Sequence, residues 1–156
     1  MIALAAFLLA SSTFHANATM PKSTVYTQCG GGNVSPELHW SGAPAGTRSF
    51  ALIAHDPDAP VSGGWYHWVA YNIPASTHEL GAGASLTAAQ SGQTSFKENA
   101  YGGPCPPPGK PHHYNFSLYA LDVSTIPGEH LTGPQLEAAI AHHTLARTTY
   151  TGLYGR

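Results

Sequence analysis

Hydrophobic residues gather along three segments of the chain in the manner of β-strands. Residues 49–54 form a nearly continuous apolar run, 65–73 are aromatic and β-branched with turn residues at both ends, and 114–121 are similar. Runs of this length and composition are typical of buried strands. The segments 30–33 and 103–109 are rich in Gly and Pro and indicate loops. The pattern therefore predicts a mostly β fold.

A helix is predicted near the C-terminal end. Thr132 can act as its N-cap with Gln135 three positions later, and a proline falls in the first turn. Helical spacing of the residues that follow predicts a helix to about Arg147, packed against the sheet. Residues 148–154 are β-branched and aromatic, which predicts a last strand. Residues 76–99 are small and polar with weak periodicity, so we expect irregular surface structure there.

Strand periodicity suggests where a pocket could form. Alternate residues of a strand share a face, so His67 is expected beside Val69, and His112 beside Tyr114. His113 must then point the opposite way, toward solvent. Taken singly, each imidazole is better explained as a hydrogen-bonded structural histidine. Together, at the ends of apolar stripes, they favour a shallow cavity with a polar floor if the two strand ends lie near each other.

A stiff acidic turn precedes the second predicted strand. Asp56 and Asp58 flank Pro57, with Pro60 close behind. Alone, this pattern is explained by an Asx-type turn in which each carboxylate accepts from local backbone N–H groups. With His67 close by, one carboxylate can instead accept from the imidazole N–H, raise the pKa of that histidine and so present positive charge to a ligand. The expected ligand is an anion, bound more tightly as pH falls.

Composition narrows the class of protein. The chain of 156 residues, 42% of them hydrophobic, fits a single domain. Only 9% of residues are charged, with 6 Lys and Arg against 8 Asp and Glu, so nucleic-acid binding is not expected. Because the sequence has no uninterrupted apolar stretch of about twenty residues, no transmembrane segment is expected. Lys97 and Glu98 are interpreted as a solvated pair.

The N-terminal region has features of a leader. Residues 2–10 are an apolar run, and Ala16-Asn17-Ala18 has the small-x-small form that signal peptidase cleaves. We therefore predict a signal peptide over residues 1–18, a single domain over 19–156 and export to the periplasm. The positive region usual in such leaders is missing, since the first Lys or Arg is Lys22. The alternative is a buried N-terminal helix of the domain.

Export bears on the two cysteines. In an oxidising compartment Cys29 and Cys105 are expected to form a disulfide, whereas in the cytosol they would be separate buried thiols. A bridge across this span would stabilise the fold by about 4 kcal/mol in the chain-entropy model. Neither cysteine has a second one at zinc-ligand spacing, so no metal site is expected from them.

Several motifs in order along the chain resemble the phosphatidylethanolamine-binding protein family, in its bacterial branch of Raf-kinase-inhibitor-like proteins. The resemblance extends from about residue 26 to residue 156. The motifs that carry it are Asp-Pro-Asp-Ala-Pro at 56–60, Gly-Trp-Tyr-His-Trp at 64–68, Tyr-Gly-Gly-Pro-Cys-Pro-Pro at 101–107 and His-His-Tyr at 112–114. Two departures are Cys105, where eukaryotic members commonly have Gly, and His113, where Arg is common. The first is in keeping with exported bacterial relatives that bridge this loop.

This resemblance implies a large central antiparallel sheet, a smaller second sheet and a cavity that takes phosphate, acetate, cacodylate or a phosphorylated headgroup. No metal or other cofactor is implied. The ligand-binding residues carried over by motif are Asp56, Asp58, Pro60, His67, Gly103, Pro107, His112 and Tyr114.

The predicted function is binding without catalysis, in which the Gly103 amide and the Tyr114 hydroxyl donate to phosphoryl oxygens. One alternative is a metal-assisted phosphoesterase that uses His55 together with the acidic and imidazole groups named above. Another is an inhibitor of a kinase or protease that acts through surface loops. The sequence identifies no protein partner, and it is compatible with a homodimer.

Overall fold

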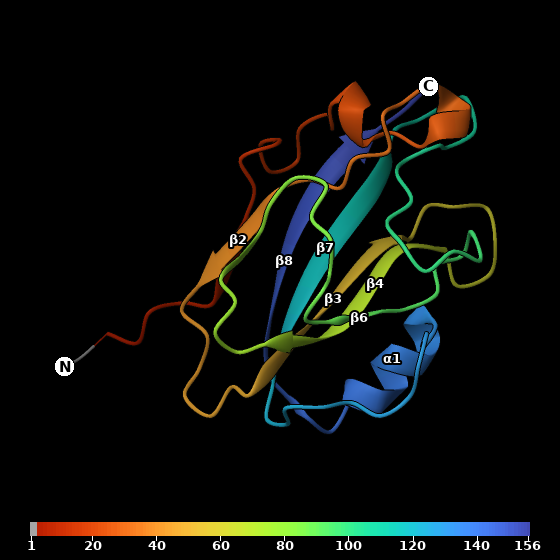
Figure 1. The fold of residues 1–156 in the computed structure, drawn as a ribbon. Helices are drawn as coiled ribbons and strands as arrows, with labels where there is room; N and C mark the ends of the chain where they lie inside the picture. The colour runs from red at the N-terminus through yellow and green to blue at the C-terminus, as the bar shows by residue number, and fades with distance from the viewer. Residues whose placement is uncertain (1–2) are drawn as a thin grey trace.

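The computed structural model describes residues 3–156, which form two antiparallel sheets and one α-helix (Figure 1). The large sheet has the strand order β6-β4-β3-β7-β8, and the small sheet has the order β1-β2-β5. The strands are β1 (Leu8–Ala10), β2 (Leu38–Ser41), β3 (Ser49–Asp56), β4 (Trp65–Pro74), β5 (Glu79–Leu80), β6 (Gln90–Ser91), β7 (His112–Leu121) and β8 (Thr144–Tyr154). The helices are α1 (Gly133–Ile140) and the 3-10 helices η1 (Lys22–Thr24) and η2 (Thr27–Cys29).

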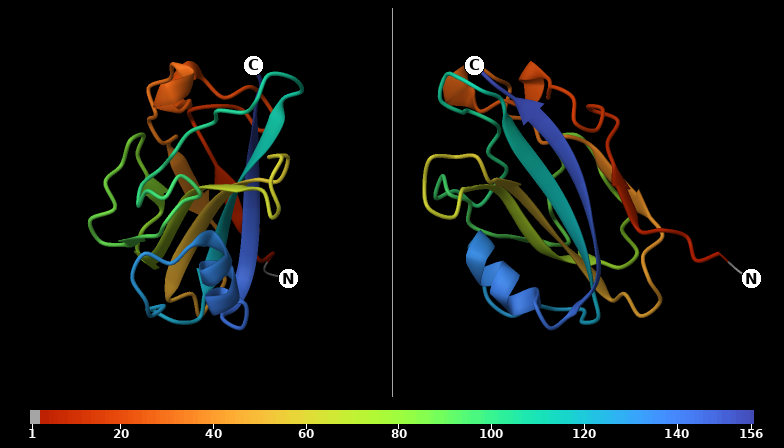
Figure 2. Two further views of the ribbon diagram at one scale, coloured as in Figure 1. Left: turned by 90° about the vertical axis from the view of Figure 1, so that its right-hand side faces the viewer. Right: turned by 180° about the vertical axis from the view of Figure 1, so that it is seen from behind.

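The large sheet is buried on both faces, which explains the continuous apolar run of its central strand. Phe50 and Leu52 of β3 pack with the small sheet, while Ala51 and Ile53 pack on the other face with α1. Figure 2 shows α1 against one side of this sheet and the N-terminal segment with β2 against the other. A strand covered on both faces needs apolar side chains at every position rather than at alternate ones. The predicted fold class is confirmed.

The C-terminal prediction is right at the helix start and wrong at its end. Thr132 and Gln135 form the expected capping box, but α1 ends at Ile140 and β8 already begins at Thr144. The Thr144 hydroxyl donates to the Ile140 carbonyl at 2.9 Å, which satisfies a group at the helix end. The residues after Ile140 include two histidines and a threonine, which are weak helix formers. From Thr144 onward, pairing of β8 along the whole of β7 therefore determines the conformation of the chain.

The segment predicted to be a leader is packed into this fold over its described part. β1 pairs with β2, and Leu9 is buried in the same core as β3. The Phe14 ring lies 6.0 Å from Phe116 and 5.2 Å from Tyr150 between ring centroids. In the described chain the packed part of this segment is thus a strand, β1, rather than the buried helix given as the alternative. Met1 and Ile2 lie outside the described residues, and cleavage after Ala18 stays a prediction.

No helix within residues 3–156 has the length and apolar character needed to cross a membrane. Residues 76–99 are mostly irregular, as expected, apart from the short strands β5 and β6.

Candidate functional site

A cavity of about 650 Å³ opens where β3 ends and where β4 and β7 begin. Because β4 and β7 pair with β3 on opposite sides, the acidic turn after β3 lies between the two histidine-bearing strands. The cavity lining includes six of the eight residues predicted for the site: Asp56, Pro60, His67, Pro107, His112 and Tyr114. Strand ends that are distant in sequence therefore meet at one hollow.

A β-bulge turns His67 into this cavity. In the pairing of β3 with β4, Ala54 faces Trp68 and His55 faces Tyr66, so His67 is skipped. A bulge shifts the alternation of side chains by one residue. Val69 consequently packs on the α1 side, whereas the His67 ring lies 5.0 Å from the Tyr114 ring on the other side. The prediction that His67 and Val69 share a face is wrong, because strand alternation alone does not reveal a bulge.

Asp56 is bound to His112 rather than to His67. Asp56 Oδ2 accepts from His112 Nδ1 at 2.7 Å, and the two side chains are 4% and 11% exposed. The other oxygen, Asp56 Oδ1, accepts from the Asp58 backbone N–H at 2.8 Å, as in an Asx turn. Asp56 thus forms both the Asx turn and a hydrogen bond with an imidazole, but the imidazole is that of His112 rather than the predicted His67. The Nε2 atom of His112 is left for a ligand.

His67 is held as a neutral ring. Its Nδ1 donates to the Gly102 carbonyl at 2.7 Å. Burial lowers the pKa of His67 to about 4, and the nearby Gly102 carbonyl and Asp56 carboxylate offset only part of this effect. The predicted rise in the pKa of His67 is therefore wrong. Near neutral pH this ring offers an acceptor at Nε2 rather than a positive charge.

Asp58 and Gly103 are absent from the lining formed by the described residues. Asp58 Oδ2 accepts from His113 Nδ1 at 2.7 Å and from the His113 backbone N–H at 2.8 Å. These two hydrogen bonds lower the pKa of Asp58. The Gly103 N–H donates to Asn33 Oδ1 at 2.8 Å, so it is not free for a phosphoryl oxygen as predicted. A Cβ at Gly103 would lie 1.9 Å from the Thr24 carbonyl oxygen, which explains the glycine there as a packing requirement.

Two donors at the cavity lack a partner among residues 3–156. The Tyr114 hydroxyl is buried, with the residue 2% exposed, and it has no hydrogen-bond partner in that part of the chain. Burial also raises the pKa of Tyr114, so the hydroxyl keeps its proton. The Trp65 indole Nε1 in the same lining is likewise buried and unpartnered within the described chain. Buried polar groups are nearly always satisfied in folded proteins, so both donors indicate a bound acceptor.

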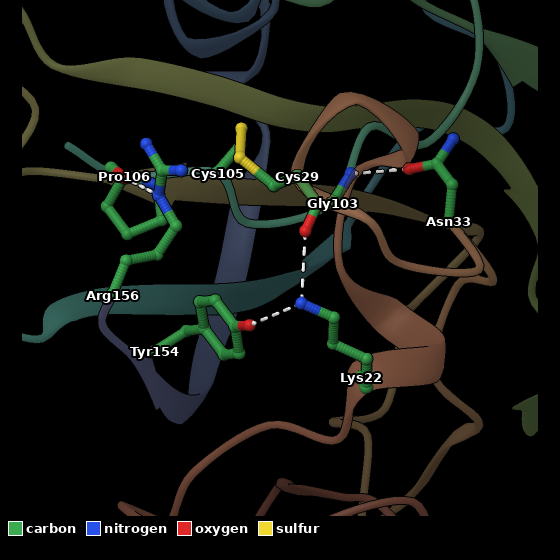
Figure 3. The surroundings of a disulfide bond; sticks show 8 residues. All are labelled: Lys22, Cys29, Asn33, Gly103, Cys105, Pro106, Tyr154 and Arg156. Carbon is green, nitrogen blue, oxygen red and sulfur yellow. Dashed lines mark hydrogen bonds between the residues drawn. A yellow bond between two sulfur atoms is a disulfide. The ribbon is translucent and has the colours of Figure 1, made fainter. Parts of the chain in front are cut away.

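The predicted disulfide is present and anchors one wall of the cavity (Figure 3). Cys105, which lines the cavity, is joined to Cys29 in η2. The Lys22 ammonium donates to the Cys29 carbonyl at 3.0 Å, and Arg156 Nε donates to the Pro106 carbonyl at 2.7 Å. The proline-rich loop is therefore tied both to the N-terminal region and to the C-terminus.

Other lining residues were missed or given a different role by the sequence analysis. Tyr26, Trp65 and Phe96 supply aromatic rings to the cavity, and Glu98 contributes a carboxylate rather than half of a solvated pair. Tyr26 and Phe96 are separated by 70 positions, and no local pattern could have joined them. Trp65 was predictable, since it lies two residues before His67 in the same motif.

The residues considered for a metal site do not form a metal-binding cluster in the part of the chain that the structure describes. Within residues 3–156, no three His, Cys, Asp or Glu side chains are placed to hold a common ion. His55 Nε2 instead lies 2.7 Å from the Gly63 carbonyl oxygen.

Comparison with known proteins identifies the family. The model of the phosphatidylethanolamine-binding protein family matches residues 10–155. The UPF0098 protein YbcL of Escherichia coli is 43% identical over 133 residues, covering 79% of this chain and 73% of YbcL. The UPF0098 protein YbhB of the same organism is 38% identical over 144 residues, covering 86% of this chain and 91% of YbhB. The chain belongs to the phosphatidylethanolamine-binding protein family.

The fold comparison agrees. The crystal structure of Escherichia coli YbcL, described as a new member of the mammalian family, superposes with a TM-score of 0.93 at 37% identity, covering 97% of this chain and 99% of that one. A relative named as a lipoprotein, LppC of Mycobacterium tuberculosis, is 36% identical over 147 residues, covering 94% of this chain and 71% of LppC. At the level of the family, this membership supports a role in binding small ligands without catalysing a reaction.

Proposed function

We propose that this protein binds a small anion or a phosphorylated headgroup in the cavity between β3, β4 and β7, and catalyses no reaction on it. The observation that carries the proposal is the Tyr114 hydroxyl, a buried donor without a partner in the described chain, in a lining shared with His67 and His112. An anion's oxygen would satisfy this hydroxyl, and the Trp65 indole N–H could donate to the same ligand.

The two histidines have different tasks in this proposal. His112, held at Nδ1 by the Asp56 carboxylate, presents Nε2 to the anion, and its imidazolium form donates a charge-assisted hydrogen bond from that atom. His67 stays neutral, so its Nε2 accepts from a hydroxyl of a singly protonated phosphoryl group. Asp56 does not repel the anion strongly, since both of its oxygens already accept hydrogen bonds.

Phosphorus NMR titration with inorganic phosphate tests the site. His112→Gln should weaken phosphate binding at least about tenfold, because it removes the imidazole that the Asp56 carboxylate orients toward the anion. His113→Gln is the matched control, since His113 is the next residue of β7 and its ring is bound to Asp58, outside the cavity lining. Equal affinities of the two variants would reject the cavity as the binding site.

We also propose that the protein is exported to the periplasm, where the Cys29–Cys105 disulfide would form and persist. The lipoprotein name of the Mycobacterium tuberculosis relative supports export. Cell fractionation with mass spectrometry of the intact protein tests this, and reduced cysteines in a cytoplasmic fraction would contradict it.

A further inference from the structure

The charge of the cavity is the starting point for a second assignment, which rests on the proposed function. The lining holds two carboxylates, Asp56 and Glu98, and, as far as the described chain goes, no lysine or arginine. Asp56 is hydrogen-bonded to His112, and His67 is neutral. The Glu98 carboxylate accepts only from the uncharged Tyr26 hydroxyl, at 3.2 Å, among residues 3–156. The inner end therefore suits an anion, while the outer end carries a negative charge.

The neighbouring lysine does not supply the missing positive charge to the cavity. Lys97 belongs to the lining of a separate hollow, together with Ser62 and Thr132 near the start of α1. Lys97 and Glu98 therefore contribute to different surfaces.

Aromatic rings connect the two ends of the cavity. Phe96 stacks on Tyr26 at 4.2 Å between ring centroids and meets the Trp65 ring edge-on at 5.3 Å. The series continues from Phe96 to His67 at 5.5 Å, and from His67 to the buried Tyr114 at 5.0 Å. Tyr26, Trp65 and Phe96 are only partly buried. The outer part of the cavity thus combines partly exposed aromatic rings with one carboxylate.

The volume leaves room for more than a free anion. At about 650 Å³, the cavity falls within the range of about 300–1,000 Å³ typical of sites for small organic molecules. A phosphate ion at Tyr114 and His112 would leave the outer, aromatic part unused.

We propose that Glu98, with Tyr26, Trp65 and Phe96, forms a subsite for the ammonium group of a zwitterionic ligand whose anionic group lies at Tyr114 and His112. Aromatic faces attract cations through the ring quadrupole, and a carboxylate adds direct charge attraction. A quaternary ammonium is favoured over a primary one. The primary group needs several acceptors in place of its water, and Glu98 already accepts from Tyr26. The ligand class is phosphocholine-like.

Calorimetric titration of the whole protein with ligands that share one phosphate group tests this. Phosphocholine should bind about fivefold or more tightly than ethyl phosphate, with phosphoethanolamine between them. In Glu98→Gln and in Phe96→Leu that preference should shrink toward unity while the affinity for ethyl phosphate stays the same. Glu129→Gln, which changes an exposed glutamate outside the cavity lining, is the control and should keep the full preference.

The outcomes separate the two proposals. If ethyl phosphate binds but phosphocholine binds no tighter, the ammonium subsite is rejected and the anion site stands. If none of these phosphates binds, both are rejected. Tighter binding of phosphoethanolamine than of phosphocholine would show that the aromatic rings do not bind the ammonium group.

The same headgroup can come from a soluble compound or from a lipid. Sedimentation with phosphatidylcholine vesicles, in competition with soluble phosphocholine, separates these sources. Retention on vesicles that Glu98→Gln weakens indicates the lipid. Binding of soluble phosphocholine without retention indicates the free compound, and binding in neither form overturns the proposal.

Discussion

Two histidine–aspartate pairs are neighbours in sequence, one in the cavity lining and one outside it, and they differ mainly in burial. The inner pair, Asp56–His112, and the outer pair, Asp58–His113, have the same Nδ1–Oδ2 distance of 2.7 Å. Side-chain exposure is 11% and 4% for the inner histidine and aspartate, and 56% and 42% for the outer ones. Since alternate residues of β7 face opposite ways, neighbours in sequence come to lie in different environments.

The equal distances show that the Nδ1–Oδ2 separation alone does not determine the role of a histidine–aspartate pair. The inner pair is shielded from water, so loss of one partner leaves a buried group unsatisfied. The outer pair is solvated on both sides, and water can replace either partner. We therefore assign the ligand to the inner pair and a small effect on the acidic turn to the outer one.

The largest expected effect on stability comes from removing the buried side chains of the N-terminal segment. A chain that starts at Thr19 loses β1 and the buried side chains of Leu9 and Phe14. Removal of two such side chains should lower the free energy of unfolding by at least about 5 kcal/mol. Urea denaturation of this shortened chain and of the full chain measures the difference. Equal midpoints would show that residues before 19 do not belong to the domain and would favour the cleaved leader.

Breaking the two pairs one at a time tests the comparison itself. Asp56→Ala should lower the free energy of unfolding by about 3–5 kcal/mol, because it leaves His112 buried without its partner. Asp58→Ala, the matched change two residues on, should cost less than about 1 kcal/mol. Chemical denaturation of both variants gives the two values. Similar losses would mean that burial does not distinguish the pairs.

The neutral state of His67 predicts a dependence of stability on pH. Because the folded pKa is about 4 and the unfolded value is about 6.5, the unfolded chain binds the extra proton first as pH falls. Stability from His67 is thus complete above pH ~6.5 and declines by about 3 kcal/mol on reaching pH ~4. Denaturation across this range, with His67→Gln as the comparison, isolates the contribution. A loss as large in the variant would assign it to other groups.

The smallest expected effect concerns salt. Since the outer pair is exposed, about 1 M NaCl should remove most of the cost of Asp58→Ala and leave that of Asp56→Ala nearly unchanged. Repeating the denaturation of both variants in low and high salt measures this. A salt-sensitive Asp56→Ala would place the inner pair in contact with solvent.

Sequence reasoning succeeded where a signal is local. Strands β3, β4 and β7 and the Thr132 capping box depend on residues within a few positions of each other, and they were predicted close to their observed bounds. The family motifs also identified most of the cavity lining.

It failed where pairing between distant segments decides the outcome. The bulge at His67 exists only in the register between β3 and β4, and it changed both the face and the hydrogen-bond partner of this histidine. The choice of His112 as the partner of Asp56 joins residues 56 positions apart. The Gly103 amide was lost to Asn33, a contact 70 positions apart. None of these contacts leaves a periodic trace in the sequence.

The most direct test of the anion site is the variant Tyr114→Phe, measured for stability and for phosphate affinity on the same sample. The ring volume is kept while the hydroxyl, which has no partner within residues 3–156, is removed. We expect unchanged or slightly greater stability of the free protein, and phosphate binding weaker by about tenfold. Unchanged phosphate affinity in Tyr114→Phe would contradict the account.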